Sequence, residues 1–225
     1  MMNVIAIDGP AASGKSSVAT AVAEILGAVH INTGSMYRAV GLKTLLAGID
    51  PVKSPEQFAE ILAGIQMRFV RQGSGDPELE VDGEFPGEQL RTEAASSAAS
   101  QVATIPSVRT RLVELQREMA GNDLLVMEGR DIGTAVFPDA KYKFFLTASP
   151  EERAKRRLLQ DGFELDPEIL QKTAAAIAER DRVDSTRAVS PLKQAEDAVF
   201  VDSSNMTKEE TVQKILQLIR EKRNG

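Results

Sequence analysis

The sequence predicts an α/β fold in which a parallel β-sheet is flanked by helices. Short apolar runs alternate with longer amphipathic stretches along most of the 225 residues, a pattern typical of repeated β/α units. The first run leads directly into a glycine-rich turn and then a helical stretch. Residues 65–91 differ, because polar and apolar residues alternate there around glycine-rich turns, which indicates a small antiparallel sheet inserted into the frame.

The spacing of apolar residues predicts the elements in chain order. Residues 3–8 are expected to form a buried strand, and residues 16–26 a helix, because apolar residues recur there at helical spacing. Residues 29–31 are a candidate second strand, and residues 36–47 a helix. The inserted sheet is expected to consist of two strands, residues 66–70 and 79–82, joined by a turn at residues 71–77.

The second half of the chain continues the alternation. Residues 91–121 are expected to be helical, with Val108, Leu112 and Leu115 on one face. The remaining strands and helices are expected at residues 124–127, 142–147, 150–160, 167–180 and 198–202, followed by a closing amphipathic helix marked by Val212, Ile215, Leu216 and Ile219.

The composition excludes several classes of protein. The chain has no cysteine and one histidine, His30, which rules out disulfides and a cysteine nucleophile and disfavours zinc. We expect His30 to be an ordinary packed or exposed histidine. A net charge of -6 makes broad binding to nucleic acid or membrane surfaces unfavourable. No apolar run approaches the ~20 residues of a transmembrane helix, and the first is too short for a signal peptide, so a soluble, cytoplasmic protein is expected.

A phosphate-binding loop follows the first strand. Gly9-x-x-x-x-Gly14-Lys15-Ser16 matches the P-loop pattern, in which glycines let backbone N–H groups wrap around phosphate oxygens. The N-terminus of the following helix adds a favourable partial positive charge. Lys15 would bridge the β- and γ-phosphates, and a following hydroxyl would hold Mg²⁺. The pattern favours Ser16 for this role, while Ser17 is either a second phosphate contact or a first-turn helix residue.

A second group of residues indicates a second anionic substrate. Guanidinium groups suit bidentate phosphate contacts, and arginines occur in two informative strings. TGSMYR (residues 33–38) places small and hydroxyl residues before a helix, while GRDIGT (residues 129–134) directly follows an apolar strand. Ligands bind at the carboxyl ends of strands in open α/β sheets, so Glu128, Arg130 and Asp131 lie where a site is expected.

The order of five motifs resembles a known family. IDGPAASGKSS, NTGSMYRA, AASQVA, GRDIGT and RDRVDSTRAVSPL together resemble the bacterial type of cytidylate kinase, one of the nucleoside monophosphate kinases. The resemblance extends from Val4 to the closing helix. It implies a P-loop NTPase fold that forms a single kinase unit over residues 1–225, with an inserted monophosphate-binding region and a helical lid. The implied boundaries are a core of residues 1–34, 92–149 and 181–225, a monophosphate-binding region of residues 35–91 and a lid of residues 150–170.

The resemblance also implies roles for individual residues. The implied catalytic residues are Lys15, Arg130, Arg157 and Arg180. The implied ATP-binding residues are Gly9, Pro10, Ala11, Ala12, Ser13, Gly14, Lys15, Ser16, Ser17 and Arg153, with Mg²⁺ on the Ser16 hydroxyl. The implied CMP-binding residues are Ser35, Tyr37, Arg38, Ser100, Arg109, Arg130, Asp131, Arg180, Asp184 and Arg187. Among these, Ser100, Arg109 and Asp131 would face the cytosine.

The implied reaction is reversible transfer of the ATP γ-phosphoryl group to CMP or dCMP. The acceptor phosphate is already ionised near pH 7, so the reaction needs positioning and charge stabilisation rather than a general base. The chain departs from the family pattern at Gly-Lys-Ser-Ser, where others have Gly-Lys-Gly-Thr, so the division of roles between Ser16 and Ser17 stays open. Asp8 and Asp131 are the candidates for a carboxylate near Mg²⁺, and Asp8 has the alternative role of bracing the loop.

Three alternative functions remain at this point. The nearest is another small-molecule kinase that uses AMP, UMP or a non-nucleotide acceptor. A nucleotide-gated binding protein or slow NTPase is less favoured, because we see no guanine-reading Asn-Lys-x-Asp sequence. A nucleic-acid-binding module is disfavoured by the net charge of -6. The family resemblance implies a monomer without nucleic-acid or membrane partners.

Overall fold

The computed structural model describes residues 3–71, 77–121 and 123–224. Its chain divides into two compact units, the first formed by Met1–His30 and Asn122–Gly225 and the second by Ile31–Gly121. The expected boundaries placed residues 92–121 with the core, whereas the structure groups them with the second unit. Residues 72–76, from the turn expected inside the inserted sheet, lie outside the described residues.

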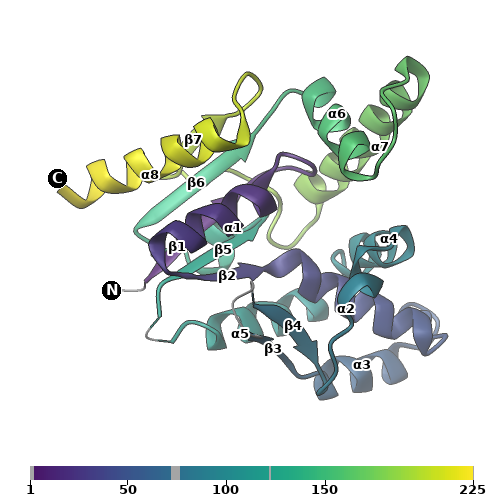
Figure 1. Ribbon diagram of the computed structural model, residues 1–225. Coiled ribbons are helices and arrows are strands. Elements are labelled where there is room, and N and C mark those ends of the chain that lie inside the picture. The colour runs from purple at the N-terminus through teal and green to yellow at the C-terminus, as the bar shows by residue number, and fades with distance from the viewer. Residues whose placement is uncertain (1–2, 72–76, 122, 225) are drawn as a thin grey trace. The chain divides into compact units, whose positions relative to one another are not determined.

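A five-stranded parallel sheet organises the first unit (Figure 1). Its strands are β1 (Val4–Asp8), β2 (Val29–Asn32), β5 (Leu125–Gly129), β6 (Tyr142–Thr147) and β7 (Val199–Asp202). Their order is β2-β5-β1-β6-β7, and the chain passes into the second unit within β2. β1 is buried along its whole length and pairs in parallel with β5 and β6, which explains its uninterrupted apolar run.

Helices cover this sheet and extend beyond it. The first unit contains α1 (Lys15–Leu26), the short π-helix η2 (Ile132–Val136), α6 (Pro150–Gln160), α7 (Pro167–Thr186) and α8 (Lys208–Asn224). α1 and α8 share one core with the sheet, where Val22 and Ile215 pack in the same cluster as Ile5 and Ile7. α6 and α7 pack against each other, as Figure 1 shows.

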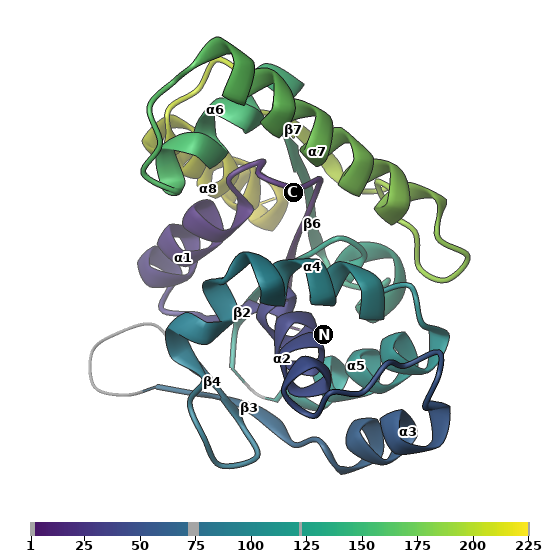
Figure 2. The same cartoon turned by 90° about the vertical axis from the view of Figure 1, so that its right-hand side faces the viewer.

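The second unit is mainly helical with one small sheet (Figure 2). Its elements are α2 (Thr33–Leu46), α3 (Pro55–Gly64), β3 (Met67–Val70), β4 (Glu78–Val81), the 3₁₀ helix η1 (Gly87–Arg91), α4 (Glu93–Val102) and α5 (Pro106–Glu118). β3 and β4 pair antiparallel, which confirms the inserted sheet. α2 and α4 lie side by side, and Gly41 allows the approach because a Cβ there would lie 2.8 Å from the backbone carbon of Ala98.

Three helix predictions need correction, and one helix was not predicted. The expected helix at residues 91–121 is two helices, because Pro106 disfavours a helical backbone at Ile105, whose φ is -83° and ψ 120°. α2 begins at Thr33 rather than residue 36, since the Asn32 side chain accepts a hydrogen bond from Ser35 N and caps the helix. α7 continues beyond residue 180 to Thr186, and α3 had no expected counterpart.

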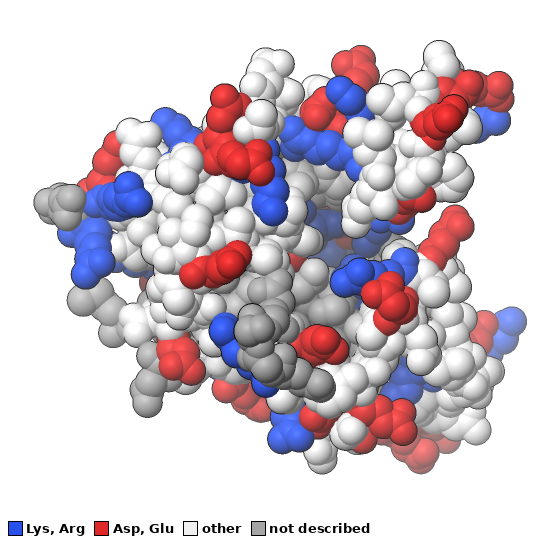
Figure 3. All heavy atoms as spheres, in the orientation of Figure 1, with Lys and Arg blue, Asp and Glu red and all other residues white. Residues whose placement is uncertain are grey.

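The surface carries mixed charge. Lys and Arg side chains are interspersed with Asp and Glu side chains on the face shown in Figure 3. Across residues 3–71, 77–121 and 123–224, no helix is long and apolar enough to cross a membrane.

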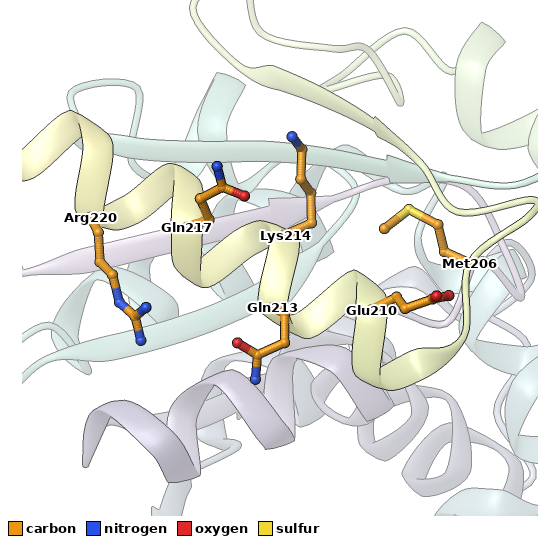
Figure 4. A pocket seen from close by; sticks show the side chains of 6 residues that line it. All are labelled: Met206, Glu210, Gln213, Lys214, Gln217 and Arg220. Atoms are coloured by element: carbon orange, nitrogen blue, oxygen red, sulfur yellow. The ribbon is translucent and has the colours of Figure 1, made fainter.

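An open pocket lies along α8 (Figure 4). Its lining residues are Met206, Glu210, Gln213, Lys214, Gln217 and Arg220. None belongs to the motifs that point to phosphate chemistry, and we assign no function to this surface.

Candidate active site

The loop between β1 and α1 has the backbone shape of a phosphate cradle. Gly9 has a φ of +152°, and a Cβ there would lie 2.0 Å from the carbonyl oxygen of Leu146, so only glycine fits. Gly14 has a φ of +86° and forms the N-cap of α1. The two glycines therefore set the path of the loop and direct it into the helix N-terminus, where unpaired N–H groups favour an anion.

Lys15 is buried within this loop. Its ammonium donates to the carbonyl oxygen of Pro10 at 2.6 Å and to Ser13 Oγ at 3.2 Å. Burial, followed by the nearby charge of Arg130, holds the pKa of Lys15 well below its usual range. A bound phosphate would favour the charged ammonium, so the charged form of Lys15 would be stabilised by an anion at this site.

Ser16 and Ser17 have different hydrogen-bond partners. Ser16 Oγ donates to Glu128 Oε2 at 2.9 Å, whereas Ser17 Oγ donates to the Gly14 carbonyl oxygen at 3.0 Å within the first helical turn. Burial would raise the pKa of Glu128, but hydrogen bonds from His30 and Ser16 and the Lys15 charge outweigh it, so this pKa lies below its usual value. An ionised carboxylate therefore faces the Ser16 hydroxyl.

Asp8 links the loop to the GRDIGT segment. Its two carboxylate oxygens accept hydrogen bonds from Ile132 N at 2.8 Å and Gly133 N at 2.7 Å. Burial raises the pKa of Asp8 to about 7, despite these bonds and the positive charge of Lys15. Through these contacts Asp8 braces the backbone of the GRDIGT segment.

Arg153 and Asp181 hold the apex of the loop. The Asp181 carboxylate accepts from Ala11 N at 2.9 Å, and Arg153 donates to the Ala11 carbonyl oxygen at 3.0 Å. Arg153 also pairs with Asp181 and donates to the Ala148 carbonyl oxygen. In this structure Arg153 contacts the loop backbone, and Asp181 was not identified from the sequence because nothing in its spacing links it to Ala11.

Arg156 is a second residue that the sequence did not single out. Its guanidinium donates to the Ser203 carbonyl oxygen at 2.7 Å, to Ser203 Oγ at 2.9 Å and to the Ser13 carbonyl oxygen at 3.4 Å. Its charged neighbours suggested a solvated or salt-bridged surface residue, and Arg156 does pair with Glu152 at 3.0 Å, but it also reaches the loop backbone. Arg157, in contrast, pairs with Asp161 at 2.8 Å, and its side chain is 40% exposed.

Two further arginines of the first unit, Arg130 and Arg187, share the carboxylate of Asp184. Arg130 Nε donates to Asp184 Oδ2 at 3.0 Å, and Arg187 Nη1 donates to Asp184 Oδ1 at 3.2 Å. Arg187 also lies 3.7 Å from an oxygen of Asp131. Arg180 is half-buried on α7, on the same helix as Asp184. The structure thus brings together four of the expected residues, Arg130, Asp131, Asp184 and Arg187.

The second unit holds the other residues expected around an acceptor. The guanidinium of Arg109 lies 5.4 Å from the centre of the Tyr37 ring, and its side chain is almost fully buried on α5. Ser35 Oγ donates to the Asn32 carbonyl oxygen, and Ser100 Oγ donates to the Ser96 carbonyl oxygen. Arg38 lies next to Gly34, where a Cβ would be 3.3 Å from Arg38 Nη1.

The donor set fits a magnesium ion that is carried by a nucleotide. Among the described residues, no three His, Cys, Asp or Glu side chains are grouped so that they could hold a metal alone. Mg²⁺ commonly keeps several waters and binds through one or two protein oxygens and substrate phosphates. The Ser16 hydroxyl, which donates to Glu128, would supply such an oxygen.

A parallel sheet with a glycine-shaped loop, a buried lysine and a helix N-terminus defines a P-loop protein of the α/β class. The model of the family described as "Cytidylate kinase" matches residues 5–221. A cytidylate kinase of Pelotomaculum thermopropionicum is 47% identical over 215 residues, covering 94% of this chain and 93% of the relative. One of Mycobacterium leprae is 45% identical over 220 residues, covering 97% and 96%. The chain belongs to the cytidylate kinase family.

A solved structure supports the fold alone. A crystal structure of an uncharacterised protein from Eubacterium ventriosum superposes with a TM-score of 0.53 at 12% identity, covering 96% of this chain and 98% of that one.

Proposed function

We propose that this chain catalyses reversible transfer of the γ-phosphoryl group from ATP to CMP or dCMP, giving ADP and CDP or dCDP. The observation that carries the proposal is the loop from Gly9 to Ser17, with Lys15 buried inside it, in a chain that belongs to the cytidylate kinase family. Two anionic substrates must meet in such a reaction, and the arginines of the chain provide the opposing charge.

On the donor side, the loop binds the ATP phosphates. The backbone N–H groups and the N-terminus of α1 stabilise the phosphate oxygens, and Lys15 contacts the β- and γ-phosphates. Mg²⁺, when bound with the nucleotide, neutralises phosphate charge. Ser16 supplies the protein oxygen for the ion. Ser17 stays with the helix backbone, and Arg153 supports the ATP site through the Ala11 carbonyl oxygen.

On the acceptor side, arginines hold the acceptor phosphate and neutralise the charge of the transferred group. Arg130 and Arg180 act at this phosphate, with Arg157 from the lid of residues 150–170 on the transferred group. The other contacts to the monophosphate come from Ser35, Tyr37, Arg38, Asp184 and Arg187. Asp184 orients the guanidinium groups of Arg130 and Arg187, because each pairs with a different oxygen of its carboxylate.

Cytosine is recognised through its hydrogen-bonding edge. Asp131 accepts from the exocyclic amine, Arg109 donates to O2 and N3, and Ser100 lies beside the base. Uracil reverses this pattern, because its O4 would face a carboxylate and its N3–H a guanidinium. Each buried mispaired group costs about 1–3 kcal/mol, which corresponds to roughly tenfold selectivity or more.

The proposal also includes the surroundings of the reaction. Water must be excluded or ATP would be hydrolysed, so the lid and the monophosphate-binding region of residues 35–91 close on the substrates. We propose a cytoplasmic monomer that acts on small molecules and has no nucleic-acid partner.

Transfer of labelled phosphate tests the reaction. The protein is incubated with γ-labelled ATP, Mg²⁺ and CMP, and the products are separated. We expect label in CDP, and its loss in Lys15→Ala. Label found only in inorganic phosphate would favour a slow NTPase, and label transferred only to AMP, UMP or another acceptor would favour a different small-molecule kinase.

A further inference from the structure

His30 lies in a buried chain of hydrogen bonds that ends at the phosphate-binding loop. Its Nε2 lies 3.3 Å from Glu128 Oε1, and the other carboxylate oxygen, Oε2, accepts from Ser16 Oγ at 2.9 Å. The opposite side of the ring, at Nδ1, lies 3.1 Å from Thr20 Oγ1. Both ring nitrogens and both carboxylate oxygens therefore have partners, which fixes the plane of each group.

Burial makes this series of hydrogen bonds costly to disrupt. His30 is 8% exposed and Glu128 is 4% exposed, so water cannot easily replace a lost partner. Toward an ionised Glu128, His30 must present Nε2–H. A neutral ring then accepts from Thr20 at Nδ1, and a protonated ring donates to it, so the contact to Glu128 is the same in both states.

This series of hydrogen bonds sets the direction in which the Ser16 hydroxyl donates its proton. A hydroxyl rotates freely, and Ser17 shows the alternative in the same helical turn, where the proton is donated to the backbone carbonyl of Gly14. When Ser16 donates its proton to Glu128, the lone pairs of Oγ remain for a cation.

We propose that His30 is a positioning residue for the metal–nucleotide site, which acts through Glu128 to orient the Ser16 hydroxyl toward Mg²⁺. The inference rests on the proposed function, in which Ser16 is the protein ligand of the ion. Partners outside the direct ligands of a metal commonly change its affinity by about 10–100-fold. His30 is one contact further from the ion, so an effect at the lower end of this range is expected.

Calorimetric titration of the full chain with ADP, with and without Mg²⁺, measures the role directly. The ratio of the two dissociation constants gives the strengthening of ADP binding by the metal. In His30→Leu this ratio should fall roughly tenfold, while the dissociation constant for ADP without metal changes less than about twofold. His30→Gln keeps an N–H that can reach Glu128 and should restore most of the ratio. Thr44→Val, which removes a buried hydroxyl bonded to the Val40 carbonyl oxygen, is the matched control and should leave it unchanged.

A kinetic readout should agree with the titration. His30→Leu should raise the KM for ATP at limiting Mg²⁺, and excess Mg²⁺ should reverse this, with the KM for CMP unchanged. A folded His30→Leu with the wild-type ratio overturns the inference, as does equal weakening of ADP with and without metal, which indicates a merely structural role. If His30→Leu does not fold, Thr20→Val tests the same series of hydrogen bonds and should lower the ratio by a smaller factor.

Two further variants separate this inference from the proposed function. Ser16→Ala should abolish most of the metal effect, and adding His30→Leu to it should cause no further loss, because both act on one ligand. An unchanged ratio in Ser16→Ala would overturn the proposed metal role of Ser16 itself. A lost ratio in Ser16→Ala with a normal ratio in His30→Leu would overturn only the inference about His30.

Discussion

The Asp181 carboxylate accepts a hydrogen bond from the backbone N–H of Ala11 at 2.9 Å, although 170 positions separate the two residues. Arg153 completes the contact by pairing with Asp181 and donating to the Ala11 carbonyl oxygen. Both backbone groups of one loop residue are therefore held by side chains of α6 and α7. These contacts join both helices to the loop that we propose binds the ATP phosphates.

Asp181→Ala should weaken both stability and ATP binding. It leaves the buried Arg153 and the Ala11 N–H without this partner, which should cost about 2–4 kcal/mol of unfolding free energy. The KM for ATP should rise roughly tenfold, with a smaller change in the KM for CMP. Glu179→Gln is the matched control, because Glu179 lies on the same helix in an exposed pair with Arg182. Denaturant unfolding and steady-state kinetics check this, and equal effects of the two variants would contradict the role of Asp181.

Asp8 makes stability depend on pH in a specific direction. Because burial raises its pKa to about 7, the folded protein binds a proton that the unfolded chain releases near pH 4. The contribution of Asp8 is thus fully present below pH 4 and is lost as pH rises to 7. The unfolding free energy of the wild type minus that of Asp8→Asn should fall between pH 4 and 7, by at most about 1.4 kcal/mol per unit. A difference that rises with pH would contradict the assignment.

Gly41 and Gly64 provide a matched pair in the second unit. At Gly41 a Cβ would lie 2.8 Å from backbone atoms of Ala98 and Ala99, whereas at Gly64 no heavy atom lies within 4 Å. Gly41→Ala should destabilise the protein by about 1–3 kcal/mol, because α2 and α4 would have to separate. Gly64→Ala should be neutral or stabilise α3 by up to about 1 kcal/mol. In thermal unfolding, the midpoint temperature of Gly41→Ala should fall, and that of Gly64→Ala should rise or stay unchanged. An unchanged midpoint in Gly41→Ala would contradict the close packing of α2 and α4.

Asp131→Asn should change the choice of acceptor. An amide can donate to O4 of uracil, which a carboxylate cannot, so the ratio of kcat/KM for CMP to that for UMP should fall at least about tenfold. Asp139→Asn, an exposed substitution eight positions further along, serves as the control. An unchanged ratio in a folded Asp131→Asn would show that another group reads the exocyclic position.

The strands and the phosphate-binding loop could be predicted because their signals are local. Each buried strand of the parallel sheet is a short apolar run. The spacing of Gly9, Gly14, Lys15 and Ser16 matches the P-loop pattern and so predicts the loop conformation. The break between α4 and α5 was also encoded locally, by Pro106, but the apolar spacing that continues across it concealed the helix end.

The partners of the loop could not be predicted, because they depend on how distant segments fold together. Asp181 and Arg156 contact the loop from positions more than 140 residues away. His30 stood alone as the one histidine, and only the pairing of neighbouring strands reveals its contact with Glu128. Charge patterns identified arginines as a class but not which carboxylate each of them would meet.

The acceptor panel tests the central claim most directly. The kcat/KM for ADP formation from MgATP is measured with CMP, dCMP, UMP and AMP supplied separately, with Lys15→Ala as the inactive control. The account predicts fast turnover with CMP and dCMP, turnover slower by roughly tenfold or more with UMP, and almost none with AMP. Absence of stimulation by all four monophosphates, or a preference for AMP, would contradict it.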